Sequence, residues 1–171
     1  MHDMISGKSV AGILHFVNQT PFDWYAKKQS TVETATYGSE MVAARTAVES
    51  IIEHRNTLRY LGVPLMEHSY LFGDNESVVN GGTLPHAKLN KRHNFLSFHR
   101  VRQAIAAGYI NFIHIRGTIN PADILSKHWA HASVWPQLQP LMFFHGDTSK
   151  LLLSKYFKDV KTTKTPSDED N

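Results

Sequence analysis

Short apolar runs separated by turn residues predict the strands of this chain. Residues 9–17 read Ser-Val-Ala-Gly-Ile-Leu-His-Phe-Val, an apolar and partly β-branched run that is typical of a strand. Turn residues at 18–21 and a second run at 22–26 predict that this strand belongs to a hairpin. Two further apolar runs, 69–73 and 110–115, predict two more short strands.

Between these runs the apolar period changes to that of a helix. Residues 37–61 place apolar side chains on one face, before Gly62 and Pro64 end the segment. That face consists of Met41, Ala44, Val48, Ile51 and Leu58. Residues 91–107 predict a second amphipathic helix that ends at Gly108. Its inward side chains are expected to be Phe95, Phe98 and Ile105.

Two weaker helical signals complete the order of elements. Residues 76–79 predict one helical turn, which the sequence Asn80-Gly81-Gly82 is expected to break. Asn120-Pro121 predicts the start of a last helix, because proline is favoured at the first helical position. The order strand, strand, long helix, strand, helix, strand, helix predicts an α/β fold in which helices flank a mixed sheet.

Composition narrows the class of protein further. The chain has 171 residues, of which 42% are hydrophobic and 19% charged, as in a globular domain. It has no cysteine, which excludes disulfides and thiolate metal sites. The apolar runs are too short to span a membrane, so we expect an intracellular protein without a membrane partner. A net charge of +3 with 11 histidines suits a polyanionic partner.

Three carboxylates stand at positions where elements begin or end. Glu40 lies early in the long helix, Asp74 follows the strand at 69–73, and Asp123 opens the last helix. Each alone has an ordinary explanation, since acidic residues are common in turns and near helix N-termini. Together, three carboxylates from three elements can converge on divalent cations, which prefer oxygen ligands.

Six stretches, in this order, make the chain resemble the ribonuclease H domain of copia-type retrotransposon polyproteins. They are residues 7–12, 23–32, 38–43, 72–75, 93–102 and 120–127. The most specific are the Asn-Pro-Ala-Asp-Ile-Leu-Ser-Lys sequence at 120–127 and the Lys-Lys-Gln sequence within 23–32. The resemblance predicts an RNase H-like domain at 5–130, followed by an extension at 131–157 and a disordered tail at 158–171.

The resemblance also implies a chemistry. Glu40, Asp74 and Asp123 match metal ligands of the family, which implies two Mg²⁺ or Mn²⁺ ions and hydrolysis of the RNA strand of an RNA–DNA hybrid. The 2′-hydroxyl groups of the hybrid are expected to mark the strand that is cut. The implied partners are the hybrid and the reverse transcriptase domain upstream in the same polyprotein.

The chain departs from the family at its N-terminus. The family's first metal ligand is an Asp on its first strand, which lies centrally in the sheet between the second and fourth strands. Here that strand would precede Met1, and Asp3 falls at a downstream loop position. We therefore expect a missing central strand, two exposed strand edges and an opened core. Metal binding and activity of this chain alone are expected to be weak.

Basic and polar residues predict a surface that binds the nucleic-acid backbone. Phosphate contacts give affinity without reading sequence, as a nuclease acting on any hybrid requires. The predicted surface comprises Lys27, Lys28, Asn75, Lys88, Lys91, Arg92, His99, Arg100 and Arg102. A solvated helix face is the ordinary explanation for each of these residues taken singly.

Other features favour packing over chemistry. His128 and His131, with His145 further on, have no third ligand motif to complete a zinc site. His114 is expected in the core or on a sheet face. Trp24, Trp129 and Trp135 are expected to pack the domain.

Two other function classes remain open from the sequence. One is a non-catalytic retroelement remnant or nucleic-acid-binding module. The other is a different nuclease of the same fold, such as a junction resolvase or an integrase core, against which the motifs at 27–29 and 120–123 argue.

Overall fold

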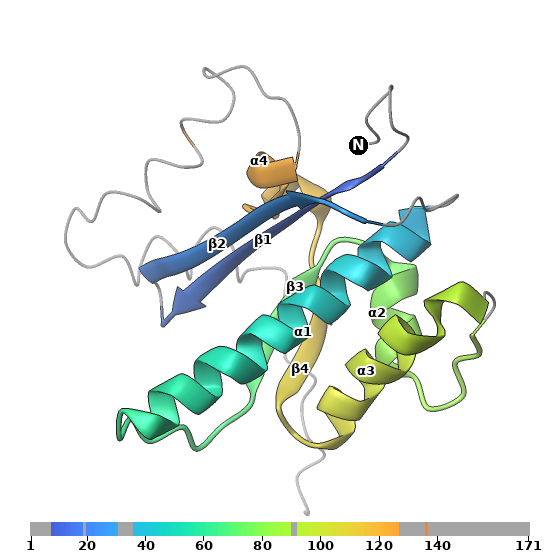
Figure 1. Cartoon of the computed structure of the whole chain (residues 1–171). Coiled ribbons are helices and arrows are strands. Elements are labelled where there is room, and N and C mark those ends of the chain that lie inside the picture. The colour runs from blue at the N-terminus through green and yellow to red at the C-terminus, as the bar shows by residue number, and fades with distance from the viewer. Residues whose placement is uncertain (1–7, 19, 31–35, 90–91, 127–135, 137–171) are drawn as a thin grey trace, which may run out of the picture.

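The computed structural model describes residues 8–18, 20–30, 36–89, 92–126 and 136. This part of the chain contains four strands and four α-helices (Figure 1). In chain order they are β1 (Val10–Val17), β2 (Thr20–Lys28), α1 (Thr36–Tyr60), β3 (Ser69–Gly73), α2 (Glu76–Thr83), α3 (Phe95–Ala106), β4 (Ile110–His114) and α4 (Asp123–Ser126). Short 3-10 turns at Arg92–Asn94 and Gly117–Ile119 precede α3 and α4. The predicted mixed α/β class with flanking helices is confirmed.

The strands form two separate sheets of two strands each. β1 and β2 pair antiparallel as the predicted hairpin, with a register shift between His15 and Phe16. β3 and β4 pair parallel, from Ser69 opposite Ile110 to Gly73 opposite His114. Within the described residues no ladder joins β1 to β3, so each of these strands has an edge without a strand partner. Among the described residues the strands are therefore divided between two sheets, as expected for a sheet without its central strand.

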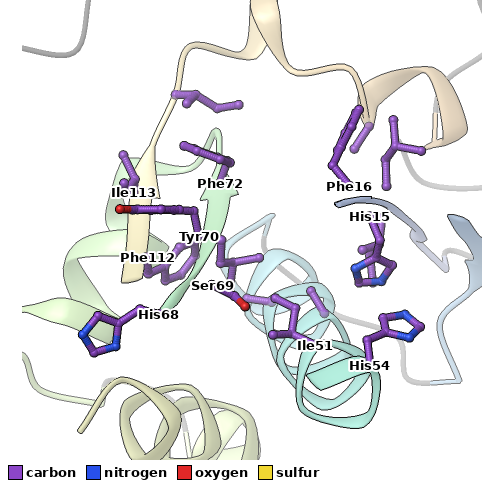
Figure 2. Close-up of a pocket in the computed structure, with 18 of the residues that line it drawn as sticks. His15, Phe16, Ile51, His54, His68, Ser69, Tyr70, Phe72, Phe112 and Ile113 are labelled. Atoms are coloured by element: carbon purple, nitrogen blue, oxygen red, sulfur yellow. The ribbon is translucent and has the colours of Figure 1, made fainter. Parts of the chain in front are cut away.

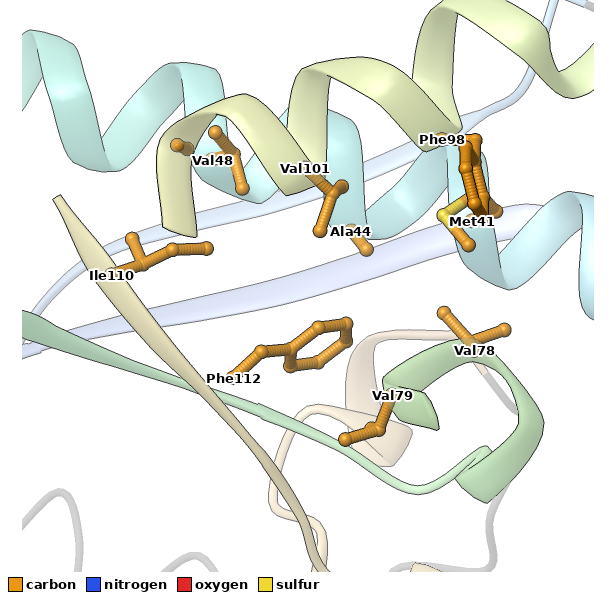
Figure 3. Close-up of a cluster of buried hydrophobic side chains, with 10 residues drawn as sticks. Met41, Ala44, Val48, Val78, Val79, Phe98, Val101, Ile110 and Phe112 are labelled. Carbon is orange, nitrogen blue, oxygen red and sulfur yellow. The ribbon is translucent and has the colours of Figure 1, made fainter. Parts of the chain in front are cut away.

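The core lies where α1, α2 and α3 pack on the β3–β4 sheet (Figure 3). Its most deeply buried apolar side chains are Met41, Val48, Val101 and Ile110. Phe112 from β4 fills the space between the sheet and α2. The inward face predicted for α1 is confirmed for Met41, Ala44 and Val48, which are all buried.

Glycines in α2 explain why this helix is longer than predicted. The helix continues through Asn80-Gly81-Gly82, where the sequence predicted a break. A Cβ on Gly82 would lie 3.2 Å from Val101 Cγ1 and 3.3 Å from Phe112 Cδ1. These glycines let the helix approach its neighbours closely, and tertiary packing therefore outweighs their weak helix propensity.

Two predictions of side-chain burial are wrong, and two lie outside the described residues. Trp24 is 68% exposed and Phe95 is 53% exposed, because each lies on the outer face of its element. For His114 the prediction left the core and a sheet face open, and the side chain is exposed on β4. The sites of Trp129 and Trp135, like the boundary at 130, the extension at 131–157 and the tail at 158–171, lie outside the residues that the structure describes.

Helix α4 packs against the hairpin at a position that only glycine fits. A Cβ on Gly12 would lie 2.7 Å from the carbonyl oxygen of Ala122 and 3.0 Å from Leu125 Cβ. The first of these atoms belongs to the backbone and cannot rotate away. We expect Gly12→Ala to displace α4 from β1 and to lower the free energy of unfolding by about 1–3 kcal/mol.

Urea denaturation and amide hydrogen exchange of residues 122–126 would measure this effect. The matched control is Ala26→Ser, at the cross-strand partner of Gly12, whose side chain is exposed. Equal stability of Gly12→Ala and this control would contradict the predicted clash.

Candidate functional site

A cavity of about 1070 Å³ separates the two sheets. Its walls are β1 residues 12–17, one face of α1, and β3 with the turn that follows it. Figure 2 shows His15 and Phe16 of β1 on one side of this space and Tyr70 and Phe72 of β3 on the other. The cavity therefore lies between the two strand edges that have no strand partner in the described part of the chain.

Two of the three predicted carboxylates line this cavity. Glu40 is the fifth residue of α1, and Asp74 directly follows β3. Residues 120–122 also line the cavity, and Asp123 follows them as the first residue of α4. All three carboxylate residues are partly buried. Their role as metal ligands stays a prediction.

The turn after β3 is held in place by several backbone contacts. The Gly73 carbonyl accepts a hydrogen bond of 2.9 Å from the Ile115 amide, and His114 Nε2 lies 3.2 Å from the Asp74 carbonyl oxygen. Asp74 Oδ2 lies 3.3 Å from where a Gly117 Cβ would be, so the carboxylate packs against this glycine. These contacts fix the position of Asp74 relative to the segment that leads to Asp123.

Asn75 has a structural function that the sequence analysis did not identify. Its side-chain oxygen accepts a hydrogen bond of 3.3 Å from the Val78 amide and so caps the N-terminus of α2. The sequence contains the signal, since an Asn stands directly before a helical segment. Its predicted contact with nucleic acid stays a prediction.

Gln29 explains why the Lys-Lys-Gln sequence ends in an amide. Its side chain is buried, and its Nε2 donates a hydrogen bond of 2.7 Å to the carbonyl oxygen of Ser39. Its backbone amide donates to the Ser9 carbonyl at 2.8 Å. Gln29 therefore ties the end of the hairpin to the first turn of α1, next to Glu40.

The predicted nucleic-acid surface is only partly available. Lys27, Lys28, Arg92 and His99 are exposed, whereas Lys91 lies outside the described residues. Arg102 donates hydrogen bonds to the carbonyl oxygens of Gly81, Leu84 and Pro85, and its guanidinium lies 5.4 Å from the centre of the Phe98 ring. Arg102 thus anchors the loop after α2. Binding of nucleic acid by this surface stays a prediction.

A second polar group on the hairpin was not anticipated from the sequence. His15 is buried with only 7% of its surface exposed, and its Nε2 has no hydrogen-bond partner among the described residues. His54 Nε2 lies 3.0 Å from Asp23 Oδ2, and the rings of His15 and His54 meet edge to face at 4.9 Å. These three residues bring possible metal ligands together in the structure. Because these three residues are far apart in the chain, no local sequence motif predicts this group.

The described elements and the cavity define an α/β domain whose strands form two separate sheets. The chain is similar to the retrovirus-related Pol polyprotein from transposon TNT 1-94 of Nicotiana tabacum. The two are 25% identical over 127 residues, which is 73% of this chain and 9% of the polyprotein. No family model and no solved structure matches the chain. In the described residues we find no helix with the length and apolarity needed to cross a membrane.

Replacing Gln29 tests its link between the hairpin and α1. Gln29→Ala leaves the Ser39 carbonyl without this donor, and we expect the free energy of unfolding to fall by about 1–3 kcal/mol. Urea denaturation monitored by tryptophan fluorescence would measure the change. Ser30→Ala, at an exposed neighbour, is the control and should have little effect. A loss no larger than that of the control would contradict this function of Gln29.

Acid is expected to destabilise the fold through His15. Burial lowers the pKa of His15 below its ordinary value of 6.5, His54 lowers it further, and Asp23 opposes these effects. The unfolded chain therefore binds this proton more readily than the folded chain. The free energy of unfolding should fall as the pH drops from 6.5 through the lowered pKa.

Denaturation measured between about pH 8 and pH 5, on both sides of the ordinary histidine pKa, would test this dependence. These measurements are made with a metal chelator present. His15→Gln should weaken the pH dependence. His68→Gln, which replaces an exposed histidine, is the comparison variant. An unchanged dependence in His15→Gln would show that another group causes the acid sensitivity.

Proposed function

We propose that this chain is the ribonuclease H-like part of a retrotransposon polyprotein and that its reaction is hydrolysis of the RNA strand of an RNA–DNA hybrid. The observation that carries the proposal is the placement of Glu40 and Asp74 on one cavity, with Asp123 directly after the segment at its rim. The similarity to a Pol polyprotein supports the same class of protein.

The donor set suits the divalent cations that this reaction requires. Carboxylate oxygens are the ligands preferred by Mg²⁺ and Mn²⁺, and Glu40, Asp74 and Asp123 are the residues that would hold them. When bound, a pair of such ions supplies activation of water and stabilisation of charge on the leaving oxygen.

The chain itself positions these groups and contributes charge for the substrate. Gln29 holds the first turn of α1, which carries Glu40, while the contacts of Gly73 and His114 hold the turn that carries Asp74. Exposed Lys27 at the end of β2 adds positive charge that attracts phosphates. The proposed substrate surface therefore includes the end of the hairpin beside α1.

The cavity also explains the weak activity that we expect of this chain alone. A strand placed between β1 and β3 would pair with both of their open edges and join the two sheets into one. In our proposal a strand from the upstream polyprotein occupies this position and contributes a fourth carboxylate. With such a strand, a longer chain should bind Mg²⁺ more tightly than this chain, because the strand would add a ligand and join the two sheets.

Cleavage of a labelled RNA–DNA hybrid tests the proposal. The assay compares this chain with a longer chain that extends upstream into the polyprotein, each with and without Asp74→Asn. We expect Mg²⁺-dependent cleavage of the RNA strand by the longer chain, and a loss of at least about a hundredfold in Asp74→Asn, since this residue is a proposed metal ligand. The short chain should be much less active.

Glu76→Gln is the matched control, because Glu76 is an exposed acidic residue in the first turn of α2, two positions after Asp74. It should keep nearly full activity. Hybrid binding without cleavage by the longer chain would overturn the enzymatic proposal and favour a non-catalytic binding module. Equal loss in both variants would show that Asp74 has no specific role.

A further inference from the structure

Three side chains from three elements meet where the hairpin packs on α1. One ring nitrogen of His15, one ring nitrogen of His54 and one carboxylate oxygen of Asp23 all lie within 4.8 Å of one another. His15 on β1 and Asp23 on β2 are direct cross-strand partners, so their side chains share one face of the hairpin. His54 reaches them from α1.

His15 is the residue that the packing of the hairpin alone does not explain. Its Nε2 is buried without a hydrogen-bond partner among the described residues, which is unfavourable unless another group binds it. Figure 2 shows the His15 and His54 rings on the same side of the cavity, close to each other. Burial lowers the pKa of His15 and so favours the neutral imidazole, which is the form that binds metals.

The distances are close to those of a metal site. The His54 nitrogen and the Asp23 oxygen lie 3.0 Å apart. Ligand atoms around a tetrahedral Zn²⁺ with bonds of about 2.0–2.1 Å lie roughly 3.3 Å apart. An ion can therefore replace the hydrogen bond between His54 and Asp23 with a small opening, while the His15 nitrogen moves inward by at most about 1.5 Å.

We propose that His15, Asp23 and His54 bind one Zn²⁺ ion that fastens the hairpin to α1. Two imidazoles and one carboxylate are a zinc ligand set with a fourth position left for water. Mg²⁺ does not compete well for such a site, because it prefers oxygen ligands alone. The Phe22 ring, 4.9 Å from the His54 ring, covers the site with apolar surface.

The zinc site is distinct from the proposed nuclease site. His54 follows Glu40 by 14 positions on the same helix, which separates them by about 21 Å along its axis at 1.5 Å per residue. The ion has a structural function in this proposal. A two-stranded hairpin is only marginally stable by itself, and here no ladder joins it to the β3–β4 sheet in the described residues. A cross-link between β1, β2 and α1 compensates for this.

Titration of the metal-free chain with Zn²⁺ tests the proposal, with calorimetry for affinity and Co²⁺ absorption as a probe of tetrahedral geometry. We expect one site that Mg²⁺ does not occupy. A saturating excess of Zn²⁺ should raise the melting temperature by about 5 °C or more, since the ion binds the folded state. Asp23→Asn and His54→Gln should each weaken Zn²⁺ binding by more than about tenfold, because each removes a direct ligand.

Asp23 and His54 are partly exposed, so these two variants keep the buried core intact, and circular dichroism would verify that both fold. His15→Gln should also lose the rise in melting temperature. His68→Gln removes a histidine that lines the same cavity outside the site and should bind Zn²⁺ normally. Asp74→Asn should also bind Zn²⁺ normally, which separates this proposal from the proposed nuclease function.

Two results would overturn the zinc proposal. One is that Asp23→Asn and His54→Gln both bind Zn²⁺ with an affinity within about twofold of that of the unmodified chain. Such a change is much smaller than the loss expected when a ligand is removed. The other is a loss of Zn²⁺ binding in His68→Gln as large as in these variants. Either result would leave Asp23 and His54 as a simple ion pair beside a buried histidine.

Discussion

The position of α1 is the constraint on which the rest of this structure depends. Its apolar face, with Met41 and Val48, packs into the core on the β3–β4 sheet. Its first turn is held by Gln29 at the end of the hairpin, and near its other end His54 meets Asp23 of β2. Arg55 donates a hydrogen bond of 3.0 Å to the hydroxyl of Ser69 at the start of β3. One helix of 25 residues thus contacts both sheets and carries a residue of both proposed sites.

The division of the four strands between two sheets makes this fold depend on helix packing. Each sheet has only two strands, and neither is expected to be stable without helices packed on it. Backbone groups along the facing edges of β1 and β3 lack the ladder that a central strand would provide. The cavity between them is therefore the place where an added strand would fit, and Glu40 and Asp74 line it.

The two proposed metal sites differ in their ligands. Near the start of α1, partly buried carboxylates offer oxygen atoms, which suit Mg²⁺ or Mn²⁺. Further along the helix, imidazoles combine with one carboxylate, which suits Zn²⁺. This difference lets each site be tested without loss of the other. It also means that metal content alone does not identify the nuclease function.

The local pattern of the sequence determined the strands and helices, because the apolar period and the turn signals depend only on residues a few positions apart. The bounds of β3 at Ser69–Gly73 and most of α1 follow directly from such patterns. The three predicted carboxylates were identified by the motifs around them, and the structure brings Glu40 and Asp74 to one cavity. Only tertiary structure decided the continuation of α2 through Gly81 and Gly82, since that depends on how closely Val101 and Phe112 approach. It also decided the meeting of His15, Asp23 and His54, because strand pairing and helix packing bring together residues that no local pattern connects.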